Sequence, residues 1–345
     1  MATFPSKVNY ATGDILTATN MNDVGGAINL LDGAQYAAGK NRIINGDFGI
    51  WQRGTSFSAG AYNADRWYTA SDATVTTSQQ TFTPGTAPVA GYEGQYFLRQ
   101  AKSAGGSYSQ LQYRVEDVRT MANQVTTLSF WAKADSNVTL APYCTQNFGS
   151  GGSTQVDTAL STVAITTSWV RYSITFTPPS ISGKTIGSSS YVQLTPTRIS
   201  TASAVTIDIW GVQWEAANTA SPFQTATGTK QGELAACQRY YYRNVANSNY
   251  GQYGFAVGTG TTTAQASFKH PTTMRTVPTS IDYANIGLIP PSGGIYAITA
   301  FTVSDSNQDS GAPAITVASG LTSGTMYRLA ANANTAAYVG FSAEL

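Results

Sequence analysis

The chain has 345 residues, of which 11% are charged, against roughly 25% in an average globular protein. Nineteen Lys and Arg nearly cancel eighteen Asp and Glu, which leaves a formal charge of +1. A neutral chain lacks the clustered basic residues that nucleic acids and anionic membranes require, and its length is sufficient for two or three domains with separate cores.

The two cysteines, Cys144 and Cys237, lie far apart in the sequence. They cannot make a disulfide scaffold, and no Cys/His spacing is typical of a zinc site, so we expect buried free thiols. No apolar run approaches the ~20 residues of a membrane span. Residues 1–7 lack the apolar stretch of a signal peptide, so we expect a product that stays in the cytoplasm until it is assembled.

Residues 1–40 contain one predicted helix. Thr17 or Asn20 can cap its first turn, because a side-chain oxygen there can accept a backbone N–H. Apolar residues then recur at the 3.5-residue period of a coiled-coil seam, at Met21, Val24, Ile28 and Leu31. Three glycines within it cost up to ~1 kcal/mol each relative to Ala. We therefore expect this helix to pack against copies of itself or a docking partner; folding back on its own β domain is the alternative.

The stretch Asn41–Gly54 (NRIINGDFGIWQRG) joins this helix to a region of β signals. Asn45-Gly46-Asp47 predicts a tight turn, because Asn and Gly tolerate the positive φ that such turns need. The apolar residues around the turn are strand formers, namely Ile43, Ile44, Phe48, Ile50 and Trp51. The stretch therefore marks the start of a β domain.

Residues 41–218 contain many short alternating runs that Gly, Ser, Asn and Pro clusters separate, without long helical periodicity. This pattern predicts a sandwich or jelly roll. The runs are Tyr96–Gln100, Tyr108–Val115, Thr127–Ala132, Val138–Tyr143, Trp169–Phe176, Tyr191–Leu194 and Val205–Trp214.

Residues 219–231 are polar and include Pro222, which indicates a linker, and Glu233–Arg239 can form a short helix. Residues 232–345 return to β signals. The predicted fold is therefore mostly β. It has a short N-terminal helix, a jelly-roll β-sandwich over 41–218 and a β-sandwich-like tip domain over 232–345.

Three stretches resemble segments of tail-fibre and receptor-binding proteins of tailed bacteriophages. They are Asn41–Gly54, Gly232–Tyr242 and Ala336–Leu345. In that family an N-terminal attachment helix precedes a jelly roll similar to carbohydrate-binding modules. The resemblance implies a virion protein made in the host cytoplasm, attached through residues 1–40 to other virion proteins. It also implies a homotrimer that binds a bacterial surface polysaccharide or lipopolysaccharide.

The runs Leu128–Lys133, Trp169–Pro178 and Val205–Trp210 resemble strands of jelly-roll carbohydrate-binding modules. Those modules form a calcium-stabilised class, in which oxygen ligands hold a structural Ca²⁺ near the first and last strands. Asp47 and Asp208 fall in the corresponding stretches. The resemblance therefore implies them as candidate Ca²⁺ ligands, although no acidic cluster surrounds either.

Sugars present hydroxyls around an apolar face, and proteins meet them with aromatic rings flanked by a few placed polar groups. Along Val205–Trp210, alternation puts Val205, Ile207 and Ile209 on the core face and Asp208 and Trp210 on the other. Trp131 likewise faces away from the core. Our candidate sugar-binding residues are Trp131, Tyr143, Tyr191, Gln193, Asp208 and Trp210. The alternative is that these Trp residues are core, or are buried between subunits of a trimer.

Catalytic signatures are missing from the sequence. His270 is the single histidine, and no nucleophile motif accompanies it, so we expect a strand or interface residue. A glycosidase needs two carboxylates, and Glu116, Asp117, Asp208 and Glu215 are pairs of a kind that any chain contains. Gly149–Ser153 lacks the Lys-Ser/Thr of a phosphate loop. We therefore do not expect an enzyme.

The triplet Tyr240-Tyr241-Tyr242 has the amphipathic rings that are enriched at interfaces, and we expect neighbours in a trimer to bury it. Three functions remain open. The first is a virion fibre subunit that adsorbs to a bacterial glycan. The second is a purely structural virion protein (head spike, collar fibre or tail adaptor), and the third is an envelope glycan hydrolase.

Overall fold

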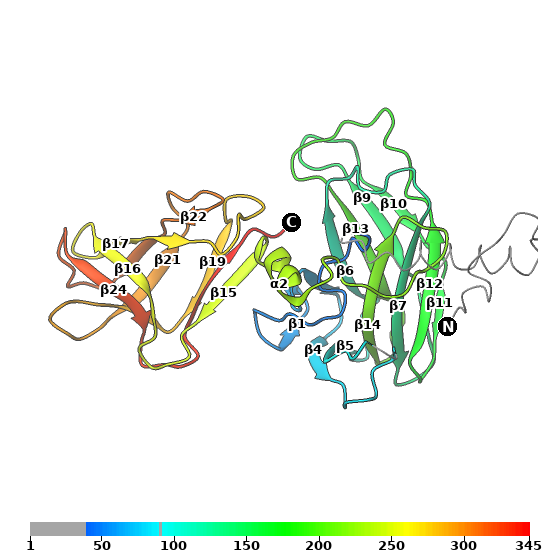
Figure 1. Cartoon of the computed structure of the whole chain (residues 1–345), viewed down its shortest axis with the longest axis horizontal. Helices are drawn as coiled ribbons and strands as arrows, with labels where there is room; N and C mark the ends of the chain where they lie inside the picture. Colours follow the sequence, from blue (N-terminus) through cyan, green and yellow to red (C-terminus); the bar gives the residue numbers. More distant parts are fainter. Residues whose placement is uncertain (1–38, 90–91) are drawn as a thin grey trace, which may run out of the picture.

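The computed structural model describes residues 39–89 and 92–345, so the predicted N-terminal helix with Met21, Val24, Ile28 and Leu31 lies outside the described residues. The described part consists of two β domains with one short helix, α2 (Lys230–Gln238), between them (Figure 1). This confirms the mostly-β fold class, and α2 confirms the short helix predicted near Glu233. Within these two ranges, no helix has the length and apolar character needed to span a membrane.

The first domain is a sandwich of two antiparallel sheets (Figure 1). Its six-stranded sheet has the order β1 (Ser56–Ser58), β4 (Val75–Thr81), β5 (Tyr96–Lys102), β14 (Val205–Glu215), β7 (Thr126–Ala134), β12 (Val170–Phe176). Its eight-stranded sheet has the order β10 (Val156–Ala159), β9 (Tyr143–Asn147), β13 (Tyr191–Ile199), β6 (Ser109–Glu116), β3 (Trp67–Ser71), β2 (Ala61–Tyr62), with β8 (Val138–Leu140) and β11 (Val163–Ile165) beside this path. The chain changes sheet repeatedly, as it does between β5, β6 and β7, which is the jelly-roll arrangement.

The main core fills the space between the two sheets. Alternate side chains of each strand point into it, because successive residues of a strand face opposite ways. The predicted core face of β14 is confirmed, since Val205, Ile207 and Ile209 are all buried there. The facing sheet contributes Leu111, Tyr113, Val192 and Leu194. Each sheet therefore has an apolar inner face that packs in the core and an outer face that the core does not cover.

The second domain contains a closed six-stranded barrel and a three-stranded sheet. The barrel has the order β16 (Gln252–Gly258), β17 (Thr263–Ala266), β23 (Ala314–Val317), β21 (Tyr296–Thr302), β20 (Ile286–Ile289), β24 (Met326–Ala331). The sheet has the order β15 (Tyr241–Val245), β25 (Tyr338–Ser342), β19 (Ser280–Ala284), and β18 (Phe268–Lys269) pairs with β22 (Ser310–Gly311). The second domain is thus all β beyond α2, as expected, and its six-stranded sheet has no free edges because it closes into a barrel.

The turn at Asn45 links the start of the sandwich to α2. Asn45 has φ +57°, as predicted, and its backbone N–H donates to Glu233 Oε2 at 2.7 Å. Its side chain bonds both the N–H and the carbonyl of Ile50, and its own carbonyl accepts from Trp67 Nε1 at 3.1 Å. Gly46 is required by lack of space and not by a positive φ, because a Cβ there would lie 2.1 Å from the Val212 carbonyl oxygen.

A buried ion pair joins the two domains. The Arg66 side chain is 1% exposed and bonds Glu344, which is 5% exposed and also lies 3.3 Å from Arg53 Nη2. The Arg66 guanidinium stacks 3.3 Å from the centre of the Tyr240 ring, and Arg53 stacks 3.5 Å from that of Tyr241. Two arginines of the sandwich thus lie between aromatic rings and a carboxylate of the second domain.

The Tyr240–Tyr242 triplet is buried by its own chain. Tyr240 and Tyr241 meet the sandwich arginines, and Tyr242 packs in the core of the second domain, where its hydroxyl bonds His270 Nδ1 at 2.8 Å. All three are 5% exposed or less. Our expectation that trimer neighbours bury this triplet is therefore corrected, since a single chain buries all three rings.

Replacing Glu344 with Gln is expected to lower the free energy of unfolding by about 3–5 kcal/mol, because it leaves the buried Arg66 charge without its carboxylate. Urea denaturation followed by tryptophan fluorescence measures this. The matched control is Asp117→Asn, which breaks the exposed Arg119–Asp117 pair and should cost less than about 1 kcal/mol. Equal losses in the two variants would contradict a structural role for the buried pair.

Candidate functional site

The outer face of the eight-stranded sheet carries a groove of about 540 Å³. Strand β6 presents Gln110, Gln112 and Arg114 to it, whereas Leu111 and Tyr113 between them point into the core. The other strands contribute in the same alternating way, and the groove is completed by Tyr108, Tyr143, Thr145, Gln155, Asp157, Ala159, Tyr191, Gln193 and Arg198. Three aromatic rings thus lie among amide, hydroxyl and charged groups.

The strand register places these side chains in rows across the sheet. Asp157 on β10 pairs with Thr145 on β9, which pairs with Gln193 on β13, which pairs with Arg114 on β6. Neighbouring strands lie about 4.8 Å apart, so the four side chains form a continuous polar row. Such a row offers both hydrogen-bond donors and acceptors to an extended ligand that lies across the strands.

Contacts within the groove hold the rings and polar groups in place. The Tyr143 hydroxyl donates to Gln110 Oε1 at 2.7 Å. Arg114 Nε donates to Gln193 Oε1 at 3.1 Å, and its guanidinium lies 4.6 Å from the centre of the Tyr191 ring. Arg114 Nη1 also donates to the carbonyl of Leu345, so the last residues of the chain brace one end of the groove.

The structure brings Tyr143, Tyr191 and Gln193 together in this groove, and it places the other three candidate residues elsewhere. Trp131, Asp208 and Trp210 lie on β7 and β14, in the six-stranded sheet. The six candidate residues therefore do not form one site, because they belong to the outer faces of two different sheets.

Trp131 and Trp210 do point away from the main core, as strand alternation predicted, but a second core covers them. They pack with Phe82, Phe97 and Phe223, with 5.4 Å between the centres of the two indole rings. Trp131 is 8% exposed and Trp210 0%. A ligand therefore has no access to the Trp210 ring, which acts as a packing residue.

The cover over Trp210 comes from two distant segments. One is the loop that holds Phe82 and Gly94, where a Cβ on Gly94 would lie 2.7 Å from Trp210 Nε1. The other contains Phe223 and belongs to the stretch 219–231 that we interpreted as a linker. Gln224 in the same stretch bonds Gln213 and Asn41. Much of this predicted linker is thus packed onto the sandwich.

The two candidate calcium ligands do not share a site. Asp208 makes a two-pronged bond to Arg99, at 2.7 and 2.9 Å, and lies 3.7 Å from Lys133 Nζ. Asp47 accepts from the Tyr92 hydroxyl at 3.0 Å. In the described part of the chain, no group of three or more His, Cys, Asp or Glu residues is placed to hold a metal. The residues present therefore do not fit the calcium site that the resemblance implied.

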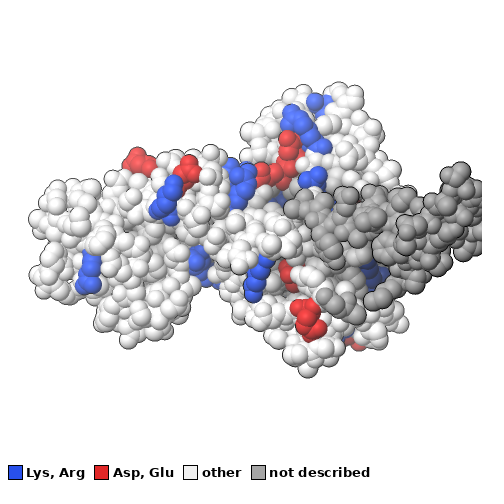
Figure 2. Space-filling view, in the orientation of Figure 1, with Lys and Arg blue, Asp and Glu red and all other residues white. Residues whose placement is uncertain are grey.

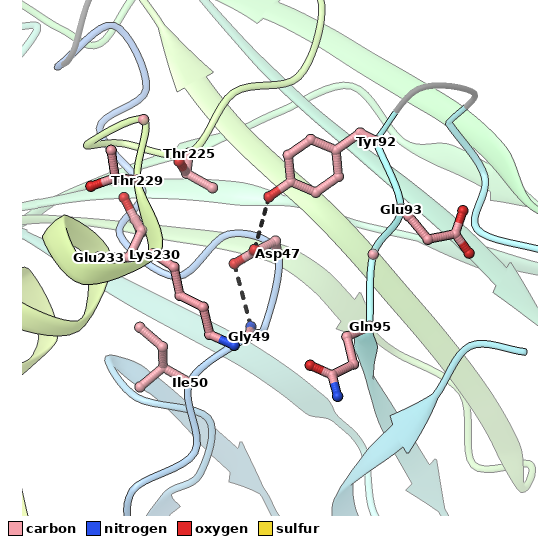
Figure 3. Close-up of a pocket in the computed structure, with 12 residues that line it drawn as sticks. Asp47, Gly49, Ile50, Tyr92, Glu93, Gln95, Thr225, Thr229, Lys230 and Glu233 are labelled. Carbon is pink, nitrogen blue, oxygen red and sulfur yellow. Dashed lines mark hydrogen bonds between the residues drawn. The ribbon is translucent and has the colours of Figure 1, made fainter. Parts of the chain in front are cut away.

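Asp47 lies in a separate cavity of about 390 Å³ between the first turn, the 92–95 segment and the start of α2 (Figure 3). Burial raises the pKa of Asp47, although the Tyr92 hydroxyl opposes the shift. Burial also raises the pKa of Glu233, whose two oxygens accept backbone N–H groups of Asn45 and Thr227. Because Glu233 is committed to backbone donors, it holds the turn and the helix together.

The residues considered for catalysis are engaged in structural contacts. Glu116 pairs with Arg239 and Asp117 with Arg119. Glu215 is buried, accepts hydrogen bonds from Gln213 and Ser221, and lies 3.5 Å from Lys40 Nζ in an ion pair. His270 is 3% exposed against Phe341, and burial lowers its pKa. Cys144 and Cys237 are buried free thiols, as expected, and burial raises the pKa of both.

No protein-family model and no curated protein matches the chain. The solved structures similar to it include the CBM22-1 xylan-binding domain from Paenibacillus barcinonensis Xyn10C (TM-score 0.33, 12% identity, covering 53% of this chain and 98% of that one). A putative sugar binding protein from Bacteroides thetaiotaomicron gives a TM-score of 0.33 at 10% identity, covering 51% of this chain and 100% of that one.

The enzymatically active domain of tailspike protein 4 of bacteriophage CBA120 gives a TM-score of 0.34 at 14% identity. The match covers 52% of this chain and 22% of the tailspike. All three TM-scores are low, and the sandwich is defined by its own strand order and core.

Sequence reasoning missed most of the groove, although a signal was present. In Tyr108–Val115, polar Gln110, Gln112 and Arg114 alternate with apolar Leu111 and Tyr113. This alternation marks a strand with one polar outer face. It could have added Gln110, Gln112 and Arg114 to the candidate residues, but the strand order β10-β9-β13-β6 that brings them beside Gln193 and Asp157 is not visible in the sequence.

Replacing Trp210 with Ala is expected to lower the free energy of unfolding by about 3–5 kcal/mol, because it empties the middle of a packed aromatic cluster. Chemical denaturation measures the loss. Tyr143→Ala, at a half-buried groove position, serves as the comparison and should cost much less. If Trp210→Ala were as stable as the unmodified chain, the covered cluster would not be a core.

Proposed function

We propose that this chain is a non-catalytic glycan-binding protein that binds its ligand in the groove of the eight-stranded sheet. The observation that supports this most is the lining of the groove: the rings of Tyr108, Tyr143 and Tyr191 lie among amides and hydroxyls on one sheet face. Aromatic rings can cover the apolar face of a sugar ring, and the amides can bond its hydroxyls.

The fixed positions of side chains in the groove also support this function. The Tyr143 hydroxyl and the Arg114 guanidinium are held by neighbouring side chains before any ligand arrives. A ligand therefore does not have to order these groups, and less conformational entropy is lost on binding. An open groove across several strands suits a linear polysaccharide better than a compact small molecule.

We further propose that the ligand is a bacterial surface polysaccharide or lipopolysaccharide, and that the chain is a phage virion fibre subunit attached through residues 1–40. This part rests on the resemblance of Asn41–Gly54, Gly232–Tyr242 and Ala336–Leu345 to tail-fibre proteins. In a homotrimer, three weak sites would act together, and linked sites raise the effective concentration of the ligand.

A purely structural virion protein is the second candidate. The burial of Trp131 and Trp210 favours it, because these are the largest rings that the sequence assigned to ligand contact. Measured glycan binding separates the two candidates. An envelope hydrolase is disfavoured by the ion pairs of Glu116, Asp117 and Asp208, which occupy the carboxylates considered for catalysis.

Glycan binding is expected to weaken by roughly threefold to tenfold in each of Tyr143→Ala and Tyr191→Ala, because each loses an aromatic contact worth ~0.5–1.5 kcal/mol. A bacterial glycan array followed by calorimetry with the best ligand measures this. Tyr250→Ala is the matched control, since Tyr250 is 60% exposed in the second domain. A ligand whose affinity is equal in all four proteins would place binding outside the groove.

The full chain is expected to be a trimer in solution, and a chain that starts at Asn41 is expected to be a monomer. The need for partners follows from the heptad seam of Met21, Val24, Ile28 and Leu31, which a single helix cannot bury. The number three follows from the resemblance to tail-fibre proteins, since so short a seam does not set the number of chains. Light scattering gives both masses. Monomers in both cases would remove the multivalent mechanism and favour a subunit that assembles only on its virion partner.

A further inference from the structure

We propose that the groove selects glycans that carry an anionic group, a carboxylate or a phosphate on the sugar, and that Arg198 is the residue that pairs with it. This inference rests on the proposed glycan-binding function and deepens it. It adds a specificity-determining residue and a ligand class to a groove that is otherwise lined by tyrosines, neutral polar groups, Arg114 and Asp157.

Arg198 belongs to the arginines of the sandwich whose guanidinium is not paired with a carboxylate within the described residues. Arg66, Arg99 and Arg119 pair with carboxylates, whereas Arg198 is exposed and has no ion pair in the described residues. Its side chain contacts Tyr143, whose ring centre lies 5.4 Å from the guanidinium carbon. A guanidinium has five N–H donors, so those of Arg198 are available to a ligand.

A break in the strand register places Arg198 on the groove face. Strand β13 shifts register between Leu194 and Thr197, where Pro196 lies. Leu194 points into the core, and so does Thr197, whose hydroxyl bonds Gln100 of the facing sheet. Regular alternation from Leu194 would have pointed residue 198 inward. The bulge reverses its direction, which is a known effect of one extra residue in a strand.

The ring of Tyr143 lies beneath the Arg198 guanidinium. Tyr143 is itself held by its bond to Gln110, which pairs with Arg198 in the neighbouring strand. A guanidinium stacked on a ring has its N–H edge free to bond an oxyanion with two parallel hydrogen bonds. The same ring can cover an adjacent sugar. An acidic sugar could thus bond the guanidinium while its ring or its neighbour lies on Tyr143.

The acidic residue of the groove lies away from Arg198. Asp157 is on β10, two strands across from β13, and its row contains Gln193 and not Arg198. Two strand spacings alone amount to about 10 Å. Asp157 is also occupied by hydrogen bonds from Thr145 and Gln155. An anion at Arg198 would therefore meet little repulsion from this carboxylate.

The surrounding surface gives no broad positive field. The chain has 19 Lys and Arg against 18 Asp and Glu, and on the one face that Figure 2 shows the basic and acidic side chains are scattered. Selection would thus depend on a local bond and not on general attraction of polyanions. We accordingly expect that a polyanion without sugars, such as inorganic polyphosphate, binds no better than neutral polymers.

The test uses the full chain and pairs of ligands that differ in one group. Polygalacturonate is compared with the same polymer after reduction of its carboxylates to alcohols, and phosphorylated mannan with its dephosphorylated form. Inorganic polyphosphate is the sugar-free control. An array of bacterial surface glycans, neutral and acidic, is probed in parallel, and binding to the best ligands is measured by calorimetry.

Four proteins are compared: the unmodified chain, Arg198→Gln, Tyr143→Ala and Arg328→Gln. The last removes the same charge from an exposed position of the second domain. We expect Arg198→Gln to weaken binding of an acidic glycan roughly 10- to 100-fold, as for loss of a hydrogen-bonded charge. It should leave binding of the matched neutral glycan unchanged, and Arg328→Gln should change neither. Preference for the carboxylated or the phosphorylated ligand identifies the anion.

Two results would overturn the inference, and they are distinguishable. If glycans bind and Tyr143→Ala weakens them but Arg198→Gln does not, the groove binds sugars without selecting the anion, and the proposed function stands alone. If no glycan on the array or in solution binds, or if Tyr143→Ala has no effect on binding, both the inference and the groove as a glycan site are wrong.

Discussion

The buried charge of Arg66 constrains the rest of the molecule. A guanidinium withdrawn from water is tolerated only when a carboxylate and further hydrogen bonds satisfy it, and Glu344 from the far end of the sequence provides that carboxylate. The two domains must therefore associate in one arrangement. The same terminal stretch brings the Leu345 carbonyl to Arg114, a wall of the groove. Domain docking and the shape of the groove thus depend on one short segment.

The two outer faces of the sandwich differ in whether other segments cover them. The outer face of β7 and β14 is apolar at Trp131 and Trp210, and Phe82 and Phe223 seal it. The outer face of β6 and β13 is polar, and it stays open. The difference follows from composition. Leaving two tryptophan rings in water would forgo the free energy of burying them, whereas amides and hydroxyls remain hydrogen-bonded to water at little cost. The open face is thus the one suited to a hydroxyl-rich ligand.

Local patterns in the sequence predicted what depends on local rules. Alternation identified the core face of Val205–Ile209, and the turn chemistry identified the positive φ of Asn45. The errors concern long-range packing. Nothing near Trp210 in the sequence indicates that residue 82 will cover it, and nothing near Gln193 shows that Asp157 joins its row. The bulge that turns Arg198 outward was equally hidden, although Pro196 hints at an irregular strand.

Arginines stacked on aromatic rings recur in this chain, and their partners separate structure from function. Arg53 lies over Tyr241 and contacts Glu344; Arg243 lies over Tyr338 and pairs with Asp282; Arg171 lies over Trp131 and bonds the Ser221 carbonyl. In each case the ring positions the guanidinium and a protein oxygen satisfies it. Arg198 has the ring, but within residues 39–89 and 92–345 no protein oxygen bonds its guanidinium. In a chain with so few charges, a positioned guanidinium that lacks its oxygen partner and opens onto a polar groove is best explained by a ligand that brings the oxygen.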